Sequence, residues 1–421
     1  MFKIDAYNNP YLQIGQSTLQ AVLSIGLDTN VALAPAPLAL AIVLDCSASM
    51  NGPKMHAARN GAIKVVQALE PTMAFMVVIF NGAAQVIFGP ALGTDENKKR
   101  ALIALQAVSV SGGTRMSTAL HAVAEKFGRQ QSRVTKVLFL TDGRNEGELR
   151  PALDQAVGRC KALDISIHAW GVGTDWDDAE LLHMATATRG NADIIPTPEQ
   201  IETAFTTAFS EMRKTAITNV HLSLWSPVGV RIPTLSQVYP TIVPLELEPD
   251  PVNPRQRVVA ALGSFAVGDQ RDYLLNLEVP VYPPGQHFMV VRPSLKFFTG
   301  GIQETEEKST RAGWVFVQWT QDTALAAQVE THIAHYTYQE ELSKAMKEGQ
   351  NALALGDRAK ATRLLGQALE MSERLQNDRA TKLLREIVHR DANGTIRLNQ
   401  QVDAVAKKTL AVNIGRTTRL N

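Results

Sequence analysis

Oxygen-bearing side chains gather in three short segments of this 421-residue chain, and the first of them has the spacing of a metal site. Asp45, Ser47 and Ser49 alternate directly after the apolar run 38–44, where a buried strand is expected to give way to a helix. Short oxygen side chains in this position are the ligands that hard divalent cations prefer. The segment therefore predicts part of a site for such a cation.

Two more oxygen donors occupy similar positions further along the chain. Thr114 follows a Ser-Gly-Gly segment and is expected to open a helix, and Asp142 follows the apolar strand predicted at 136–141. Taken alone, each segment also fits a helix N-cap or a turn. Their combination, with every segment at the end of a predicted strand or the start of a helix, favours a shared metal site.

The segments DCSAS (45–49), GGT (112–114) and LTDG (140–143) resemble the metal-ion-dependent adhesion site of von Willebrand factor A domains of the bacterial intracellular type. The resemblance covers residues 38–213. It implies that Ser47 and Ser49 bind the metal directly, Thr114 directly or through water, and Asp45 and Asp142 often through water. The implied cation is Mg²⁺, with Mn²⁺ or Ca²⁺ as substitutes. The last coordination position would take an Asp or Glu carboxylate from a partner protein.

Catalysis at this site would require a general acid or base beside the cation. His56 is the nearest histidine in sequence, but it lies among apolar residues of a predicted helix and has no evident partner. The chain also has no Gly-x-x-x-x-Gly-Lys-Ser/Thr phosphate loop. We therefore expect a binding protein and no enzymatic activity.

Composition narrows the classes of partner and the cellular location. The chain has 42 basic and 41 acidic residues, so its net charge of +1 gives no electrostatic reason to expect nucleic acid or an anionic membrane as a partner. Its two cysteines, Cys46 and Cys160, lack zinc-like spacing and are expected to be reduced, structural thiols. No secretory signal or transmembrane run is evident, so we expect a cytoplasmic protein.

Changes of pattern divide the chain into several domains. Residues 38–213 alternate strands with helices, which predicts an α/β domain with a doubly wound, mostly parallel, Rossmann-like sheet. In such sheets ligands bind beyond the carboxyl ends of the strands. Residues 214–320 show short alternating runs separated by proline and glycine, which is typical of a β-sandwich. Strands predicted within residues 1–37 lack partners of their own, so we expect them to join this sandwich and leave the α/β domain as an insertion.

The remaining chain is predicted to be helical and then flexible. Residues 321–405 contain a hairpin pattern around Gly356 and Asp357 that resembles one tetratricopeptide repeat. One repeat cannot bury its own apolar face. A small helical bundle is therefore favoured over a peptide-binding groove. Residues 406–421 are predicted to form a basic, flexible tail. This segment contains no acidic residue, and its basic residues are Lys407, Lys408, Arg416 and Arg419.

Two functions of different classes fit these features. The first is a metal-dependent protein-interaction module that acts as an intracellular scaffold or signalling adaptor. The alternative is an accessory or substrate-linking subunit of an AAA ATPase of the MoxR or metal-chelatase type, because von Willebrand A proteins commonly accompany such machines. Affinity purification distinguishes the two, since only the second requires a stable complex with an ATPase.

The tail also contains two candidate phosphoacceptors, Thr417 and Thr418. Threonine among arginines resembles segments read by forkhead-associated domains, which favour particular residues three places after the phosphothreonine, where Leu420 stands relative to Thr417. The alternative is an unmodified, frayed tail. If a Ser/Thr kinase acts here, the added dianion creates a docking site for a signalling partner. Mass spectrometry of the native protein should then find phosphate on one of these threonines, and consistently bare threonines would exclude the idea.

Overall fold

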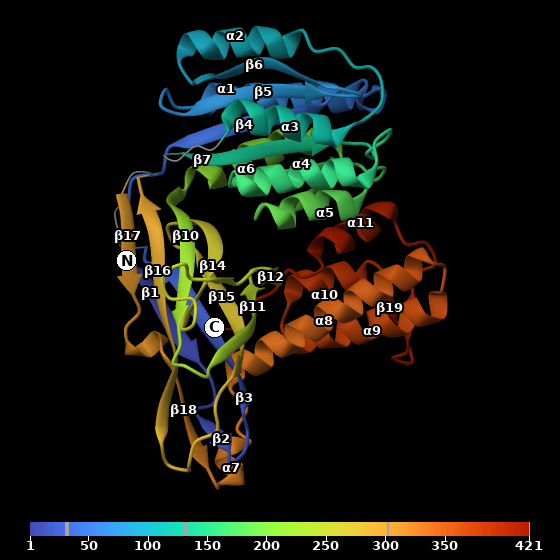
Figure 1. Cartoon of the computed structure of the whole chain (residues 1–421). Coiled ribbons are helices and arrows are strands. Elements are labelled where there is room, and N and C mark those ends of the chain that lie inside the picture. The colour runs from blue at the N-terminus through green and yellow to red at the C-terminus, as the bar shows by residue number, and fades with distance from the viewer. Residues whose placement is uncertain (30–32, 129–132, 301–302, 421) are drawn as a thin grey trace.

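The computed structural model describes residues 1–29, 33–128, 133–300 and 303–420. It divides into an α/β domain, a β-sandwich and a helical part that lies beside the sandwich (Figure 1). The predicted fold class, a doubly wound α/β sheet combined with a β-sandwich and a C-terminal helical segment, is confirmed.

The α/β domain is built on one six-stranded sheet with the strand order β6-β5-β4-β7-β8-β9. All neighbouring strands run parallel except β6, which is antiparallel to β5. Every residue of the central strand β4 is buried, as expected for a parallel strand covered on both faces. The strands are β4 (Leu38–Asp45), β5 (Ala74–Phe80), β6 (Ala84–Leu92), β7 (Val134–Thr141), β8 (Ile165–Val172) and β9 (Ala192–Ile195).

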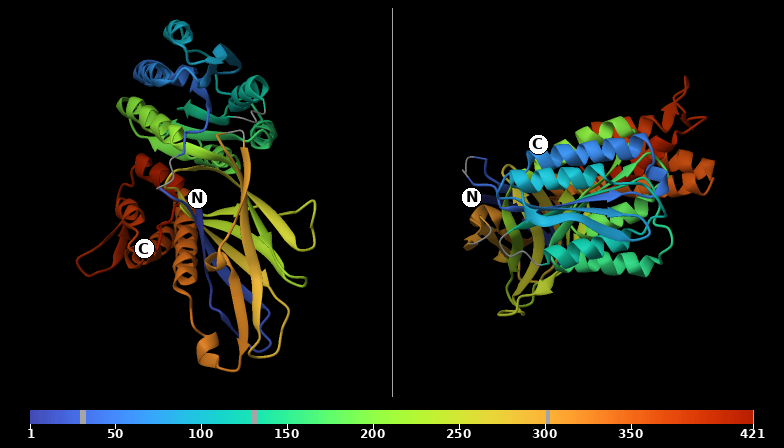
Figure 2. Two further views of the ribbon diagram at one scale, coloured as in Figure 1. Left: turned by 90° about the vertical axis from the view of Figure 1, so that its left-hand side faces the viewer. Right: turned by 90° about the horizontal axis from the view of Figure 1, so that it is seen from above.

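Helices cover both faces of this sheet. One face packs against α1 (Pro53–Ala68), α2 (Asp95–Gln106) and α6 (Ile201–Arg213), and these helices share one apolar core with the sheet. The opposite face packs against the helices α3 (Met116–Phe127), α4 (Arg150–Ala162) and α5 (Asp178–Ala187), which form a second core. Figure 2 shows this layered arrangement from two further sides.

The β-sandwich is assembled from both ends of the chain. One sheet has the order β1-β3-β15-β11-β12, and the other has the order β13-β14-β10-β16-β18-β2 with β17 paired to β16. Because β3 pairs with β15, the N-terminal strands belong to the sandwich and the α/β domain is inserted between β3 and β10. The strands of the first sheet are β1 (Phe2–Tyr7), β3 (Thr18–Leu27), β15 (Gln270–Glu278), β11 (Arg231–Tyr239) and β12 (Val243–Leu245). Those of the second are β13 (Glu248–Pro249), β14 (Arg257–Ala266), β10 (Thr215–Trp225), β16 (His287–Thr299), β18 (Val315–Thr320), β2 (Tyr11–Gln13) and β17 (Gln303–Lys308).

The long helix α8 joins the sandwich to the helical part. Its residue Tyr336 is fully buried against the sandwich, packs with Val22, Val238 and Leu274, and donates a hydrogen bond to Asp272. Further along, α8 shares an apolar core with the helices that follow it. The elements of the helical part are α7 (Thr323–Ala326), α8 (Thr331–Ala354), α9 (Arg358–Arg374), α10 (Asp378–Arg385), the hairpin β19 (Val388–Arg390) and β20 (Ile396–Leu398), and α11 (Ala404–Asn413).

The predicted boundary of a flexible tail at residue 406 is wrong. Helix α11 occupies most of that segment, with Ala406 and Leu410 in the core of the helical part and Val412 in a core of the α/β domain. Acidic partners for three of the four basic side chains come from distant segments, so the local sequence pattern does not reveal them. These ion pairs are Lys408 with Asp178 at 2.6 Å, Arg416 with Asp193 at 3.2 Å and Arg419 with Asp272 at 3.6 Å.

Both candidate phosphoacceptors lie in this docked segment. The Thr417 hydroxyl donates to the carbonyl of Val238 at 2.6 Å, and the Gln339 amide donates to the Thr418 hydroxyl at 2.6 Å. A kinase would therefore need the segment released from the sandwich and from α8 before it could reach either hydroxyl. Phosphorylation itself stays a prediction.

The two cysteines form no disulfide with each other, as the sequence predicts. Cys46 and Cys160 are free and buried, and burial raises the pKa of their thiols to about 11 and about 12. Both therefore stay protonated and unreactive at neutral pH. Among the described residues, no helix combines the length and the hydropathy needed to cross a membrane.

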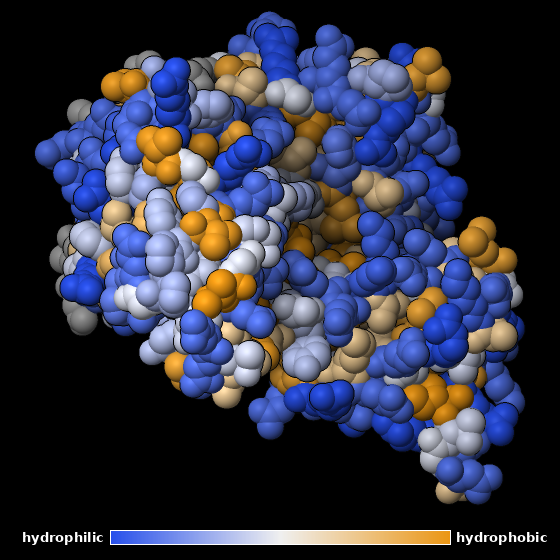
Figure 3. Space-filling model, turned by 60° about the horizontal axis from the view of Figure 1, so that its bottom comes forward, coloured by the Kyte–Doolittle hydropathy of each residue, from blue (hydrophilic) through white to orange (hydrophobic). Residues whose placement is uncertain are grey.

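A cavity of about 1070 Å³ lies where the α/β domain, the sandwich and the last segment of the chain meet. A hollow with apolar side chains on its floor is visible on the underside of the molecule (Figure 3). The half-buried Lys136 of β7 lines the cavity, and its ammonium donates to the Thr215 hydroxyl at 2.7 Å. Desolvation lowers the pKa of this ammonium from 10.5 to about 8.

This lowered pKa predicts a pH-dependent stability. Between pH 8 and 10.5 the unfolded chain binds more protons at Lys136 than the folded chain does, so this residue makes stability rise with pH across that window. Lys136→Met should therefore raise the free energy of unfolding by about 1–2 kcal/mol at pH 7, and this gain should fade toward pH 10.5. Urea unfolding of both proteins over this range, with the exposed Lys126→Met as control, measures the effect. A difference in the free energy of unfolding between the wild type and Lys136→Met that stays constant with pH would contradict this prediction.

Candidate metal centre

The candidate site lies at the carboxyl edge of the α/β sheet. Asp45 is the last residue of β4, and Asp142 directly follows β7. These strands are parallel neighbours with Leu44 opposite Leu140, so their ends bring both carboxylates to one edge. Both side chains are fully buried. This is the edge at which open α/β sheets bind ligands.

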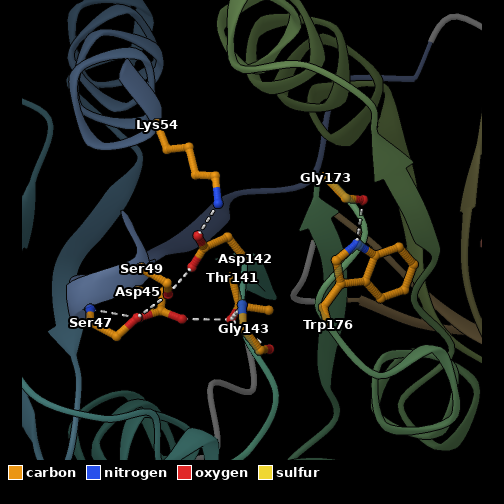
Figure 4. A network of polar contacts seen from close by, with 9 residues as sticks. All are labelled: Asp45, Ser47, Ser49, Lys54, Thr141, Asp142, Gly143, Gly173 and Trp176. Atoms are coloured by element: carbon orange, nitrogen blue, oxygen red, sulfur yellow. Dashed lines mark hydrogen bonds and ion pairs between the residues drawn. The ribbon is translucent and has the colours of Figure 1, made fainter. Parts of the chain in front are cut away.

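Asp45 is held by partners from both strands. One carboxylate oxygen accepts from the backbone N–H of Ser47 at 2.8 Å, and the other accepts from the Thr141 hydroxyl at 2.6 Å (Figure 4). Burial raises the pKa of Asp45, and the hydrogen bonds from Thr141 and Ser47 oppose that shift. Thr141 is a site residue that was not predicted from the sequence, although it directly precedes Asp142.

Asp142 has a hydroxyl and an ammonium as its partners. Its Oδ1 accepts from the Ser49 hydroxyl at 2.6 Å, and its Oδ2 accepts from Lys54 Nζ at 2.5 Å (Figure 4). Lys54 lies in the first turn of α1. Lys54 was not predicted from the sequence either, although its place five residues after Ser49, where a helix is expected to begin, was a usable signal.

The three predicted hydroxyl ligands approach one another. The oxygens of Ser47 and Ser49 lie 3.1 Å apart. A Cβ atom placed on Gly143 would lie 3.4 Å from the Thr114 hydroxyl oxygen and 3.6 Å from that of Ser49, so these two oxygens border the same space. The structure thus brings together all five residues singled out from the sequence.

Thr114 lies in a loop and does not open the helix as predicted, because α3 begins at Met116. The loop is fixed by backbone hydrogen bonds, from the N–H of Ser111 to the carbonyl of Cys46 at 2.9 Å and from the N–H of Ala48 to the carbonyl of Gly112 at 3.1 Å. These bonds fasten the loop of Thr114 to the loop of Ser47 and Ser49. The backbone therefore holds the two loops side by side, and this brings the three hydroxyls close to one another.

The chemistry of this donor set suits a hard divalent cation. All of its donors are oxygens, two from buried carboxylates and three from hydroxyls, which fits Mg²⁺, Mn²⁺ or Ca²⁺ better than zinc. In the described part of the chain, no three His, Cys, Asp or Glu side chains cluster as a metal site. His56 contacts Asn60 on the exposed side of α1, with 3.2 Å between its Nε2 and the Asn60 amide nitrogen.

Comparisons with known proteins agree with this fold. A von Willebrand factor type A structure from Catenulispora acidiphila is similar over 100% of this chain and 97% of its own length, with a TM-score of 0.90 and 27% identity. The ArnB paralog VWA2 from Sulfolobus acidocaldarius covers 99% of this chain and 98% of its own with a TM-score of 0.64. Its identity of 14% makes this a likeness of fold alone.

Sequence comparison gives a partial match to one curated protein. The uncharacterized protein sll0103 from Synechocystis is 25% identical over 257 residues, which is 60% of this chain and 59% of that relative. The chain thus matches about three fifths of that relative's length. The family model of the von Willebrand factor type A domain matches residues 39–207, and with the fold and the site it identifies the inserted α/β domain as a von Willebrand factor type A domain.

Proposed function

We propose that this domain binds a divalent cation and, through it, a second protein. Ser47, Ser49 and Thr114 would hold the cation, and Asp45 and Asp142 would balance its charge. Mg²⁺ is the first choice, with Mn²⁺ or Ca²⁺ as substitutes. The observation that supports this proposal is the convergence of three hydroxyls and two buried carboxylates on one edge of the sheet.

The donor set also suggests what kind of partner binds. Hydroxyls are neutral ligands, so a cation held here would keep affinity for one more anionic oxygen. An Asp or Glu side chain of a partner protein has the right chemistry to supply it. Ser49 is exposed, whereas Ser47, Thr114 and the two carboxylates are buried, so a partner would approach from the side of Ser49.

The role we propose is that of an intracellular scaffold or signalling adaptor in the cytoplasm, without catalytic activity. His56, the histidine nearest to the site in sequence, contacts Asn60 on its own helix and is a poor candidate for an acid or base at the cation. An accessory subunit of an AAA ATPase remains the alternative, and it differs in requiring a stable complex with that ATPase.

Thr114→Val should remove one ligand with little cost to the fold. Thr114 is 4% exposed, and valine has nearly the same shape but lacks the oxygen. A ligand that binds only the native state stabilises a protein by about 2.7 kcal/mol when its free concentration is about a hundred times its Kd. Mg²⁺ or Mn²⁺ should therefore raise the melting temperature of the wild type by several degrees and that of the variant much less. Thr118→Val, which loses an exposed hydroxyl nearby, serves as control. Equal shifts in all three proteins would place the cation elsewhere.

A pull-down from native lysate tests the protein partner. The wild type should retain a partner with Mg²⁺ and lose it with EDTA, and Thr114→Val should lose it in both buffers. Asp45→Ala is a poorer choice, because it would leave the buried Ser47 N–H unpaired at a cost of about 1–3 kcal/mol and would remove the 2.6 Å hydrogen bond from the Thr141 hydroxyl. A retained ATPase would favour the alternative role. Proteins retained equally with EDTA would assign the binding to the sandwich or the helices.

A further inference from the structure

Lys54 places an ammonium on one of the two carboxylates of the candidate metal centre. Its side chain reaches from the first turn of α1 to Asp142, as Figure 4 shows, and its Nζ lies 2.5 Å from Oδ2. The Asp142 side chain is fully buried, whereas that of Lys54 is 29% exposed. The lysine can therefore swing toward solvent, but the carboxylate cannot.

The ammonium of Lys54 changes the net charge at this edge of the sheet. Asp45 and Asp142 together contribute two negative charges, and Lys54 contributes one positive charge. With a divalent cation added, the group would carry one net positive charge if Lys54 stays and none if its charge is removed. Lys54 therefore opposes the cation electrostatically, and it also occupies an oxygen of Asp142.

We propose that Lys54 is an intramolecular competitor for the divalent cation, so that loading the site requires its ammonium to leave Asp142. This inference rests on the proposed metal site. Because Lys54 occupies Asp142, the site without metal is expected to have a low affinity for the cation. The released ammonium stays on the rim of the site, where it can pair with the carboxylate of an acidic partner. One residue thus weakens binding of the metal alone and favours the complex of metal and acidic partner.

A purely structural ion pair would behave differently. Removing one member of a buried pair leaves the other charge uncompensated and lowers stability. A structural Lys54 would therefore affect the melting temperature without changing the intrinsic affinity for metal. Competition instead predicts that the affinity rises when the ammonium is removed, and this readout needs no knowledge of the partner.

The test is isothermal titration of the full chain with Mn²⁺ alone, at fixed pH and ionic strength. Lys54→Met should bind Mn²⁺ about tenfold more tightly than the wild type, because it lacks the competing charge. Lys64→Met is the matched control, since this lysine lies on the same helix in an exposed ion pair with Glu202. It should bind Mn²⁺ as the wild type does. Equal or weaker binding by Lys54→Met would overturn the proposal.

A second variant keeps the test decisive if Lys54→Met does not fold. The guanidinium of Lys54→Arg can hold both oxygens of one carboxylate, so this variant should bind Mn²⁺ about threefold more weakly than the wild type. Equal or tighter binding would contradict competition. Failure of wild type and variants alike to bind Mn²⁺ would overturn the proposed metal site itself. Binding by the wild type that is unchanged in the Lys54 variants would overturn only the competition.

Discussion

Burial of two carboxylates at one edge of a parallel sheet is the constraint on which the rest of this structure depends. A buried charge is costly unless hydrogen bonds and opposite charges compensate it. For Asp45 the compensation comes from Ser47 and Thr141, and for Asp142 it comes from Ser49 and Lys54. These partners lie on β7, at the start of α1 and in the loop that joins β4 to α1, so the sheet register and the site geometry depend on each other.

The insertion of the α/β domain into the sandwich sets the direction in which the site faces. The chain enters the domain at β4 and leaves it after α6, and the N–H of Ala36 donates to the carbonyl of Thr215 at 2.8 Å where the two crossings meet. Because β4 runs from that junction to Asp45 over eight residues, the site lies about 25 Å from it. The edge that carries the hydroxyls is thus far from the sandwich attachment, while α11 and the residues after it secure the edge strand β9.

The sequence predicts the central part of this architecture well, because it is encoded locally. The apolar run of β4 followed by alternating Asp and Ser, and the pairing rules of parallel strands, place Asp45, Ser47, Ser49 and Asp142 at one edge of the sheet. Thr114 was assigned from its motif, and backbone hydrogen bonds of its loop bring it to the same edge. Two site residues were not predicted, because Thr141 contacts Asp45 on a neighbouring strand and Lys54 reaches Asp142 through a long, flexible side chain. The docking of the C-terminal segment was not predicted either, because Arg416 and Arg419 form ion pairs with carboxylates on β9 and β15, which are far away in sequence.

The central claim is that the hydroxyls of Ser47, Ser49 and Thr114 surround a divalent cation. A crystal of the full chain grown with Mn²⁺, with data collected near the manganese absorption edge, tests it most directly. We expect one anomalous peak within coordination distance of these three oxygens, with Lys54 Nζ withdrawn from Asp142. A peak elsewhere, or none at a saturating concentration of Mn²⁺, would contradict the proposed metal site.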